Sequence, residues 1–279
     1  MDLMSYLERA KGLDRLTTPV QRAARLLPPG RARDALYGVW LGHPLHPVLV
    51  QVPVGTWLSA SFLDAWPGNE KASRRLVLAG LAASVPAALA GAADWSEQHE
   101  QQMRVGVVHA LANAAAITLY AASVAVPARR AAGLRLAGLA AAAAGGFLGG
   151  HIAYRQSAGA NQAEPVPHLV EPGWHDLMPL AELSELAAHK PVKRMLGDVP
   201  VVVVRDRDRV HVLADRCSHL SGPLSDGGCH DGRLTCPWHG STFRLADGTV
   251  ARGPATAPQP VFRTRVAAGI LQACLPGAG

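Results

Sequence analysis

The sequence predicts a two-part α + β protein, in which an N-terminal bundle of four transmembrane helices is followed by a small all-β domain. Long runs of Ala, Leu, Val and Gly fill residues 43–155, and short β-branched stretches between turn residues fill residues 168–275. A short polar segment with two prolines, residues 156–167, lies between them. Its composition is typical of a linker, and we expect it to tether the β domain close to the helices.

Residues 1–42 are predicted to form a basic amphipathic segment. Apolar residues recur there at helical spacing with basic residues between them: Leu3, Leu7, Leu13, Leu16 and Val20 alternate with Arg9, Lys11, Arg15 and Arg22. Such a segment next to a membrane span usually lies on anionic lipid; packing on the bundle or on a partner subunit is an open alternative. This segment and the loops explain the net charge of +6, and we expect no nucleic-acid partner because no binding motif is present.

Four apolar runs are each long enough to cross a bilayer, which takes about 20 helical residues for a hydrocarbon core of about 30 Å. They are residues 45–66, 76–95, 105–126 and 132–154. A soluble Ala-rich bundle is the alternative, but the runs lack the continuous charged face that a water-facing helix needs. The lipid bilayer is therefore a predicted partner of this chain.

Residues 2–156 resemble an uncharacterised family of predicted membrane proteins, the domain of unknown function 2231. Four short motifs carry the resemblance: Gly42-His43-Pro44-Leu45-His46-Pro47, Val52-Pro53-Val54-Gly55 with Asp64, Gly91-Ala92-Ala93-Asp94, and His151-Ile152-Ala153-Tyr154. The resemblance implies an architecture and almost no chemistry. The bias towards Ala, Arg, Gly and Pro is typical of high-GC bacteria.

Ionisable residues gather at one predicted membrane boundary. Four spans joined by short loops alternate in direction, so the starts of spans one and three share a face with the ends of spans two and four. That face carries His43, His46, Asp94, His109 and His151. Such residues are functional candidates. One hypothesis is that His43 or His46, with His109 and His151, line a site for a b-type haem, a metal ion or a quinone head group; the favoured alternative is that these histidines and Asp94 only hydrogen-bond the bundle together. Asp64 is predicted to lie alone at the opposite end.

The all-β domain is predicted from short β-branched stretches separated by Asp-Arg, Asp-Gly and Ala-Gly turns. The stretches are residues 200–204, 210–213, 249–250 and 262–273, and residues 180–187 are predicted to form one or two helical turns. Two of the four cysteines, Cys229 and Cys274, fall in or beside this strand-like sequence. We predict that both are buried thiols.

The other two cysteines each belong to a Cys-His pair. Cys217-Ser218-His219 is followed, after sixteen residues, by Cys236-Pro237-Trp238-His239. Two thiolates and two imidazoles at this spacing fit a [2Fe–2S] cluster, in which neutral imidazoles on one iron remove negative charge and raise the reduction potential. Two Cys and two His can also bind Zn²⁺ tetrahedrally, and a disulfide is a further alternative.

The motif and its surroundings resemble the Rieske iron–sulfur family. The likeness covers residues 164–275 and includes the loops Pro237-Trp238-His239-Gly240-Ser241 and Gly253-Pro254-Ala255. The resemblance implies that Cys217 and Cys236 bind one iron and that a loop around Pro254 shields the cluster. His219 and His239 would bind the other iron at an exposed tip.

Departures from the family pattern predict the range of the reduction potential. High-potential members carry a disulfide between two further cysteines, and Ser221, Gly222 and Trp238 occupy that neighbourhood here. Hydrogen bonds to the cluster also raise the potential; Ser241 retains a hydroxyl for this purpose, whereas Phe243 stands where such members have Tyr. The resemblance therefore implies a ferredoxin-like centre of low to intermediate potential.

These features predict a one-electron carrier that works between a reductase and an acceptor protein. An iron–sulfur subunit of a membrane quinone or haem oxidoreductase is the alternative; a self-contained Rieske oxygenase is not expected, because only forty residues follow His239.

We expect an integral protein of the bacterial plasma membrane. Basic residues in the short loops are nearly balanced between the two sides of the membrane, so the positive-inside rule does not decide the orientation. The start carries no signal peptide, so the β domain is predicted to lie in the cytoplasm, where it would acquire its cluster.

Overall fold

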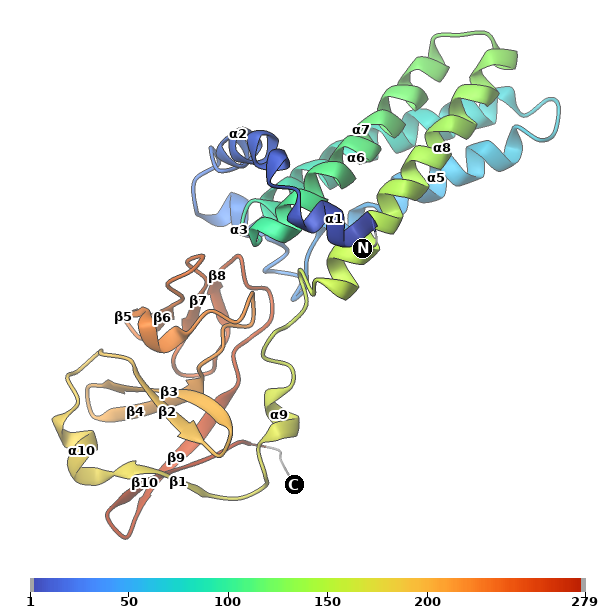
Figure 1. Ribbon diagram of the computed structural model, residues 1–279. Helices are drawn as coiled ribbons and strands as arrows, with labels where there is room; N and C mark the ends of the chain where they lie inside the picture. Colours follow the sequence, from blue (N-terminus) through green and yellow to red (C-terminus); the bar gives the residue numbers. More distant parts are fainter. Residues whose placement is uncertain (1–2, 277–279) are drawn as a thin grey trace. The chain divides into compact units, whose positions relative to one another are not determined.

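The computed structural model describes residues 3–276. The chain divides into two compact units. One is helical and contains the residues up to Pro28 together with Pro44–Ala158; the other is mainly β and contains Pro29–His43 together with the residues from Gly159 onward. Figure 1 labels the helices and strands of both units.

The helical unit is an antiparallel bundle, and the N-terminal helices α1 and α2 lie on its surface. Its elements are α1 (Leu3–Arg9), η1 (Lys11–Leu13), α2 (Asp14–Ala24), α4 (His46–Leu49), α5 (Gln51–Leu63), α6 (Glu70–Trp95), α7 (Glu100–Val124), α8 (Ala128–Gly150) and the π-helical turn η2 (His151–Arg155). Helix α5 packs on α6 and α8, and α7 packs on the same two helices. Helices α5 and α7 therefore face each other diagonally across the bundle.

Among residues 3–276, three helices are long and apolar enough to cross a membrane, instead of the predicted four. They are Glu70–Trp95, Glu100–Val124 and Ala128–Arg155. The first predicted span, residues 45–66, is instead divided into α4 and the 13-residue α5. Pro53 causes the division, because it has no N–H to donate to the Leu49 carbonyl. Thirteen helical residues cover only about 20 Å, less than a hydrocarbon core of about 30 Å.

Ring stacking and one ion pair join the helices in the half of the bundle that contains Trp57. Trp57 of α5 stacks on Tyr120 of α7 with ring centres 4.4 Å apart. Beyond this layer, Arg135 donates to Asp64 Oδ1 at 2.6 Å, and both side chains are largely buried. The prediction that Asp64 lies alone is therefore wrong. The distant Arg135 supplies its partner, because helix packing brings α8 next to the end of α5.

The N-terminal helices pack on the bundle end that contains the loop between α6 and α7. Several polar contacts hold them, among them Asp14 with Arg104 at 2.7 Å, Gln21 Nε2 with the Ser96 carbonyl at 2.8 Å, and Glu8 with His151 at 2.9 Å. Of the alternatives for residues 1–42, the structure contains the packing on the bundle for α1 and α2. Leu3, Tyr6 and Val20 remain exposed, so contact of this segment with lipid stays a prediction.

The β unit consists of two antiparallel sheets. The six-stranded sheet has the order β1-β10-β9-β4-β3-β2, and the four-stranded sheet has the order β5-β6-β7-β8. The strands are β1 (His175–Pro179), β2 (Val192–Leu196), β3 (Val199–Asp206), β4 (Arg209–Ala214), β5 (Gly228–His230), β6 (Arg233–Thr235), β7 (Thr242–Arg244), β8 (Val250–Arg252), β9 (Val261–Ala267) and β10 (Ile270–Cys274). Short helices α3 (Arg31–Tyr37), α9 (Val166–Leu169), α10 (Leu180–Glu185) and η3 (Leu224–Asp226) accompany them.

Strand β3 lies between two hydrophobic cores. Alternate side chains point to opposite faces of a strand; Val201 and Val203 therefore belong to one core, with α9 and α10, and Val202 and Val204 belong to the other. The second core also contains Cys217, Cys236 and residues of the small sheet. Burial on both faces explains why this stretch is an uninterrupted valine run and does not alternate with polar residues.

The structure confirms the predicted strands and changes three details. Strands β1, β2, β5, β6 and β7 fall in stretches for which no strand was predicted. Part of the expected tether is packed, because Ala163 and Val166 are buried and Gln162 N–H donates to the Ser218 carbonyl. Cys229 and Cys274 are free thiols that are half-buried instead of fully buried.

Candidate iron–sulfur centre

Two loops with the same hydrogen-bond pattern hold the Cys-His pairs. In the first, the Cys217 N–H donates to the Gly222 carbonyl and the Cys217 carbonyl accepts from the Ser221 N–H, both at 2.9 Å. In the second, the Cys236 N–H donates to the Ser241 carbonyl at 2.8 Å, and the Cys236 carbonyl accepts from the Gly240 N–H at 3.1 Å. Each cysteine therefore begins a tight loop of matching size.

The loops bring the four predicted ligands together with the sulfurs inside and the imidazoles outside. Cys217 and Cys236 are only 1% and 3% exposed, and their thiols are close enough to hydrogen-bond. His219 and His239 are half-buried, with ring centres 5.1 Å apart and ring planes at 86°. The result is a pair of thiols beside a pair of imidazoles.

Donor groups surround both sulfurs. Cys217 interacts with the His219 N–H and the Ser241 hydroxyl, and Cys236 interacts with the N–H groups of Trp238 and His239. The hydrogen bond with Cys217, helped by the two backbone donors, lowers the pKa of Cys236 to about 7. The same bond and burial raise the pKa of Cys217, so Cys236 ionises first. Donors directed at sulfur stabilise the thiolate form that binds iron.

Ser241 and Phe243 are both buried beside the paired cysteines, and their influence on the reduction potential stays a prediction. Ser241 is fully buried; its Oγ accepts from the Ala255 N–H at 2.9 Å and hydrogen-bonds Cys217. Phe243, on β7, is also fully buried in the core that contains both cysteines. Pro254 is buried beside Ala255, in the loop predicted to shield the cluster.

Sequence reasoning missed the role of Gln259. Its side-chain amide donates to the carbonyls of Ala214 and Arg216, and its Oε1 accepts from the Ser218 N–H at 3.1 Å. It therefore fastens the proline-rich loop to the loop of Cys217. The one available signal was its position between Pro258 and Pro260, which lack backbone donors.

In the sequence, Gly222 is notable only because it is not the cysteine of high-potential members. The structure gives a steric reason why this residue is glycine. A Cβ at Gly222 would lie 2.8 Å from Cys236 Sγ and 3.1 Å from the Trp238 ring. Any larger residue would push the second ligand loop away from the first. The contact joins residues fourteen positions apart, so no local sequence pattern reveals it.

The donor set fits a binuclear cluster. Among residues 3–276, no three His, Cys, Asp or Glu side chains gather in the manner of a site for a single ion; the four ligands are arranged as a thiol pair and an imidazole pair. With metal–nitrogen bonds of about 2 Å, two imidazoles at a tetrahedral angle on one metal have ring centres roughly 5 Å apart. The His219–His239 separation of 5.1 Å agrees with that arrangement.

The remaining two cysteines do not join this group. Burial, together with the negative charge of Asp206, raises the pKa of Cys229 to about 11. Its sulfur therefore stays a neutral thiol at physiological pH, and a neutral thiol is a poor iron ligand. Cys274 is at the end of β10, in the other sheet.

Among the predicted membrane histidines in the described part of the chain, His46 and His109 lie next to each other. The rings of His46 and His109 have centres 6.2 Å apart. His151 instead pairs with Glu8 at 2.9 Å, and His43 belongs to the β unit. Asp94 lies near the end of α6, one turn from Gly91.

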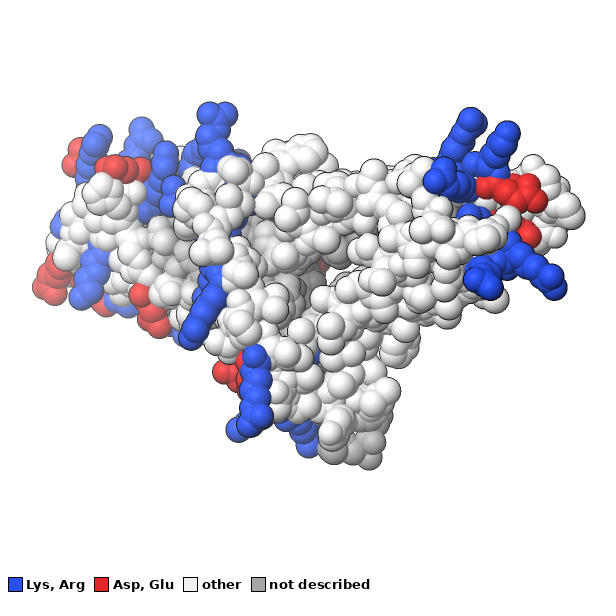
Figure 2. All heavy atoms as spheres, turned by 90° about the horizontal axis from the view of Figure 1, so that it is seen from above, with Lys and Arg blue, Asp and Glu red and all other residues white. Residues whose placement is uncertain are grey.

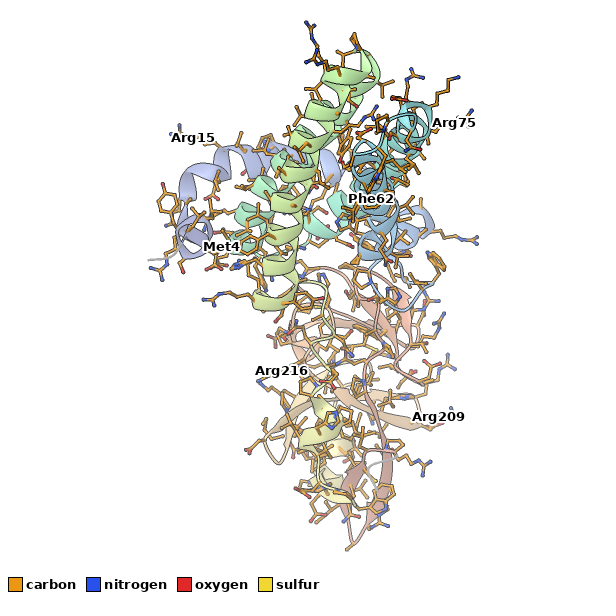
Figure 3. The ribbon with its side chains drawn as sticks, turned by 90° about the vertical axis from the view of Figure 1, so that its right-hand side faces the viewer. Met4, Arg15, Phe62, Arg75, Arg209 and Arg216 are labelled. Atoms are coloured by element: carbon orange, nitrogen blue, oxygen red, sulfur yellow. The ribbon has the colours of Figure 1, made fainter. Side chains whose placement is uncertain are left out.

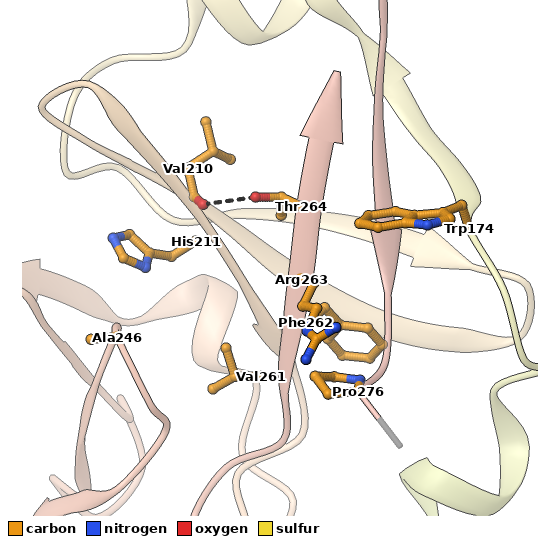
Figure 4. Close-up of a pocket in the computed structure, with 9 residues that line it drawn as sticks. All are labelled: Trp174, Val210, His211, Ala246, Val261, Phe262, Arg263, Thr264 and Pro276. Atoms are coloured by element: carbon orange, nitrogen blue, oxygen red, sulfur yellow. Dashed lines mark hydrogen bonds between the residues drawn. The ribbon is translucent and has the colours of Figure 1, made fainter. Parts of the chain in front are cut away.

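A shallow hollow in the β unit lies over β4 and β9. Its lining includes Trp174, His211 and Arg263, and Thr264 Oγ1 donates to the Val210 carbonyl at its edge (Figure 4). Burial lowers the pKa of His211, which favours the neutral ring. The four Cys and His ligands are not part of this hollow.

The two-sheet fold and its pair of Cys-His loops define an iron–sulfur electron-transfer domain. Residues 176–263 match the Rieske [2Fe-2S] domain family. The chain belongs to this family, whose domain binds a [2Fe–2S] cluster. The match does not extend to residues 2–156, so the resemblance of that part to the domain of unknown function 2231 stays a prediction.

Similar proteins include two bacterial ferredoxins. The chain is 32% identical over 96 residues to the anthranilate 1,2-dioxygenase ferredoxin subunit of Burkholderia cepacia, which covers 34% of this chain and 86% of the relative. It is 34% identical over 74 residues to ferredoxin CarAc of Metapseudomonas resinovorans, which covers 26% and 69%. Among solved structures, the ferredoxin of Sphingomonas yanoikuyae B1 aligns with a TM-score of 0.34 at 22% identity, over 37% of this chain and 100% of that chain.

Proposed function

We propose that this chain is a membrane-anchored one-electron carrier, in which Cys217 and Cys236 bind one iron of the [2Fe–2S] cluster and His219 and His239 bind the other. The observation that carries the proposal is the pair of matching loops, which presents two buried thiols beside two half-exposed imidazoles. The cluster supplies a single electron-accepting centre. The protein holds its sulfur side in an apolar core and leaves the imidazole side accessible.

Electrons would enter and leave at the imidazole edge. His219 and His239 are the ligands with partial exposure, and the adjacent Trp238 is 51% exposed. An exposed aromatic side chain next to the redox centre is well suited to contact a partner protein. The Burkholderia relative is a ferredoxin subunit of a dioxygenase; by analogy, the partner here is a redox protein that donates or accepts one electron.

Membrane anchoring is supported by the surface of the helical unit. Leu58, Phe62, Val85, Leu89, Leu111 and Phe147 are large apolar side chains exposed on its long helices. In Figure 2, Lys and Arg gather at the left, at the right and along the lower edge of the view, and a wide uncharged surface lies between these groups. In Figure 3, Phe62 lies along the side of the bundle and Arg75 lies near its end. An apolar belt between charged ends is typical of a membrane protein.

Exchange of the ligand histidines tests the assignment. Changing His219→Cys or His239→Cys replaces a neutral imidazole by a thiolate, so we expect an altered electron paramagnetic resonance spectrum. We also expect a midpoint potential lower by on the order of 100 mV or more. His230→Cys is the matched control, because His230 is an exposed residue of the same small sheet. An unchanged Rieske-type spectrum in both ligand variants would refute the assignment.

A further inference from the structure

We propose that the outer face of the small sheet, β5 to β8, is a docking surface for an acidic redox protein. The inference rests on the proposed function, because it names the chemistry of the partner that contacts the imidazole edge. Three exposed arginines carry it: Arg233 on β6, Arg244 on β7 and Arg252 on β8. We call this surface the arginine face. The loop that contains Cys236 and His239 joins β6 to β7.

The strand register places the three arginines on one face of the sheet. Arg233 pairs with Arg244 on the neighbouring strand, and Thr242 pairs with Arg252. Side chains two residues apart point to the same face of a strand, so Arg244 shares a face with Thr242 and therefore with Arg252. The opposite face of β7 carries Phe243, which is fully buried. The arginines are therefore on the face that points to solvent.

The stability of the fold does not explain this arrangement. Like charges directly opposite each other destabilise an antiparallel pair of strands, and Arg233 lies opposite Arg244. Within residues 3–276, none of the three guanidinium groups forms an ion pair with a carboxylate. Arg244 Nη1 donates to a neutral group, the Thr249 hydroxyl, at 3.0 Å. The arginine face therefore has positive charge available for a second molecule.

The carboxylates of this sheet lie at the end away from the ligand loop. Asp231 is in the turn between β5 and β6, and Asp247 is in the turn between β7 and β8. Asp231 Oδ2 lies 3.0 Å from His230 Nδ1, and Asp247 Oδ1 accepts from the Thr249 hydroxyl at 2.6 Å. The arginines lie between these turns and the ligand loop. Positive charge therefore increases towards the iron–sulfur centre.

The arginine face adjoins the edge through which electrons are proposed to pass. Arg233 is three residues before Cys236, a distance of no more than about 11 Å along the chain. Arg252 directly precedes Gly253 and Pro254, the loop predicted to shield the cluster. A standard interface buries about 800 Å² on each partner, a patch roughly 30 Å across. A protein that contacts His239 would therefore also cover the arginine face.

The chemistry of the face favours a protein with surface carboxylates. A guanidinium group binds a carboxylate through two parallel hydrogen bonds. Arginine and tryptophan are enriched at protein interfaces and lysine is depleted; residues 228–252 contain three arginines and the exposed Trp238 but no lysine. Anionic lipid would also bind positive charge, but it would leave the imidazole edge without an electron donor or acceptor.

Electron transfer from the reduced full-length protein to two cytochromes tests the proposal. The probes are ferric cytochrome b5, which is acidic, and ferric cytochrome c, which is basic. In each reaction the cluster loses one electron and the haem iron of the probe gains it. At an ionic strength of about 20 mM, Arg233→Glu/Arg244→Glu should lower the second-order rate constant for cytochrome b5 at least about tenfold. The rate constant for cytochrome c should not fall.

A second charge reversal is the matched control. Arg209→Glu/Arg263→Glu changes the net charge equally, but these exposed arginines belong to the six-stranded sheet. This variant should react with cytochrome b5 within about twofold of the wild type, because steering depends on charge near the contact. Both variants must keep the cluster resonance signal and the wild-type elution in gel filtration. Equal losses of rate in the two variants would overturn the proposal.

Two further outcomes identify what has failed. In lipid nanodiscs, anionic phosphatidylglycerol should leave the reaction of the wild type with cytochrome b5 intact; if it suppresses this reaction but not that of Arg233→Glu/Arg244→Glu, lipid occupies the face and the proposal is wrong. A cluster that is reversibly reduced in voltammetry but reacts equally with both cytochromes overturns the docking surface alone. A chain without a Rieske-type resonance signal overturns the proposed function as well.

Discussion

The hydroxyl of Ser241 links Cys217 to the loop that is predicted to shield the cluster. It hydrogen-bonds the Cys217 sulfur and accepts from the Ala255 N–H at 2.9 Å, and no part of it reaches solvent. A hydrogen bond to a ligand sulfur stabilises the reduced cluster, which carries one more negative charge. We therefore predict that this single side chain raises the reduction potential of the centre.

Ser241→Ala is expected to lower the reduction potential. A hydrogen bond of about 1 kcal/mol corresponds to roughly 40 mV for a one-electron couple, so a fall of a few tens of millivolts should appear in protein-film voltammetry. Ser218→Ala is the matched control, because Ser218 is buried in the same centre but its hydroxyl donates to the Ala257 carbonyl at 2.8 Å. Equal shifts in the two variants would show that loosening of the loop, and not the sulfur contact, sets the potential.

The residues of the centre differ in how far the sequence predicts them. The spacing of Cys217, His219, Cys236 and His239 is local and was sufficient to propose a cluster. Gly222 and Gln259 act through a steric contact and through hydrogen bonds to residues at least fourteen positions away. Such contacts leave no periodic pattern, so only the folded chain reveals them.

At the scale of single elements, helix α3 has an unexpected position. It lies in the N-terminal segment, yet it packs in the β unit: Asp34 Oδ1 accepts from the Gly253 N–H at 3.0 Å. A Cβ at Gly253 would lie 2.7 Å from the Tyr37 ring. The helix therefore supports the Gly253-Pro254 loop, which precedes the Ala255 N–H bound by Ser241.

Loss of this support should weaken retention of the cluster. Asp34→Ala removes a hydrogen bond to a charged acceptor, worth about 1.5–3 kcal/mol and several degrees of melting temperature. We expect the visible absorbance of the cluster to bleach at a correspondingly lower temperature. Asp34→Asn keeps an oxygen acceptor and should bleach near the wild-type temperature. If both variants melt with the wild type, α3 does not stabilise the loop.

Helices and strands were predicted correctly where the sequence shows a long run of β-branched or apolar residues. The valine run gave β3, whereas the stretch predicted over residues 262–273 forms two strands, β9 and β10, with the Ala-Gly turn at residues 268–269 between them. The three-residue strands β5, β6 and β7 are too short to show alternation and were missed. The first apolar run was predicted as one span from its length and composition, which do not show that Pro53 lacks the N–H needed to continue the helix between α4 and α5.

For the whole molecule, the helical unit combines exposed apolar helices with ion pairs at both bundle ends. Arg104 with Asp14 lies at the end with the loop between α6 and α7, and Arg135 with Asp64 lies at the other. Charged pairs at the two ends of apolar helices of 23 to 26 residues are placed where the membrane interfaces would lie. The two ends of α7 should then face opposite compartments.

Cysteine labelling at the two ends of α7 tests the span and its direction. We expect Ala125→Cys to react with a membrane-impermeant maleimide in intact bacterial cells, and Gln101→Cys to react only after permeabilisation, because the latter end is shared with the end of α8 that leads to the β unit. Each variant is made with Cys229→Ser and Cys274→Ser, so that the half-buried native thiols give no background. The unmodified serine background is the control. Labelling of both sites in intact cells would contradict a spanning α7, and labelling of Gln101→Cys alone would place the β unit outside the cytoplasm.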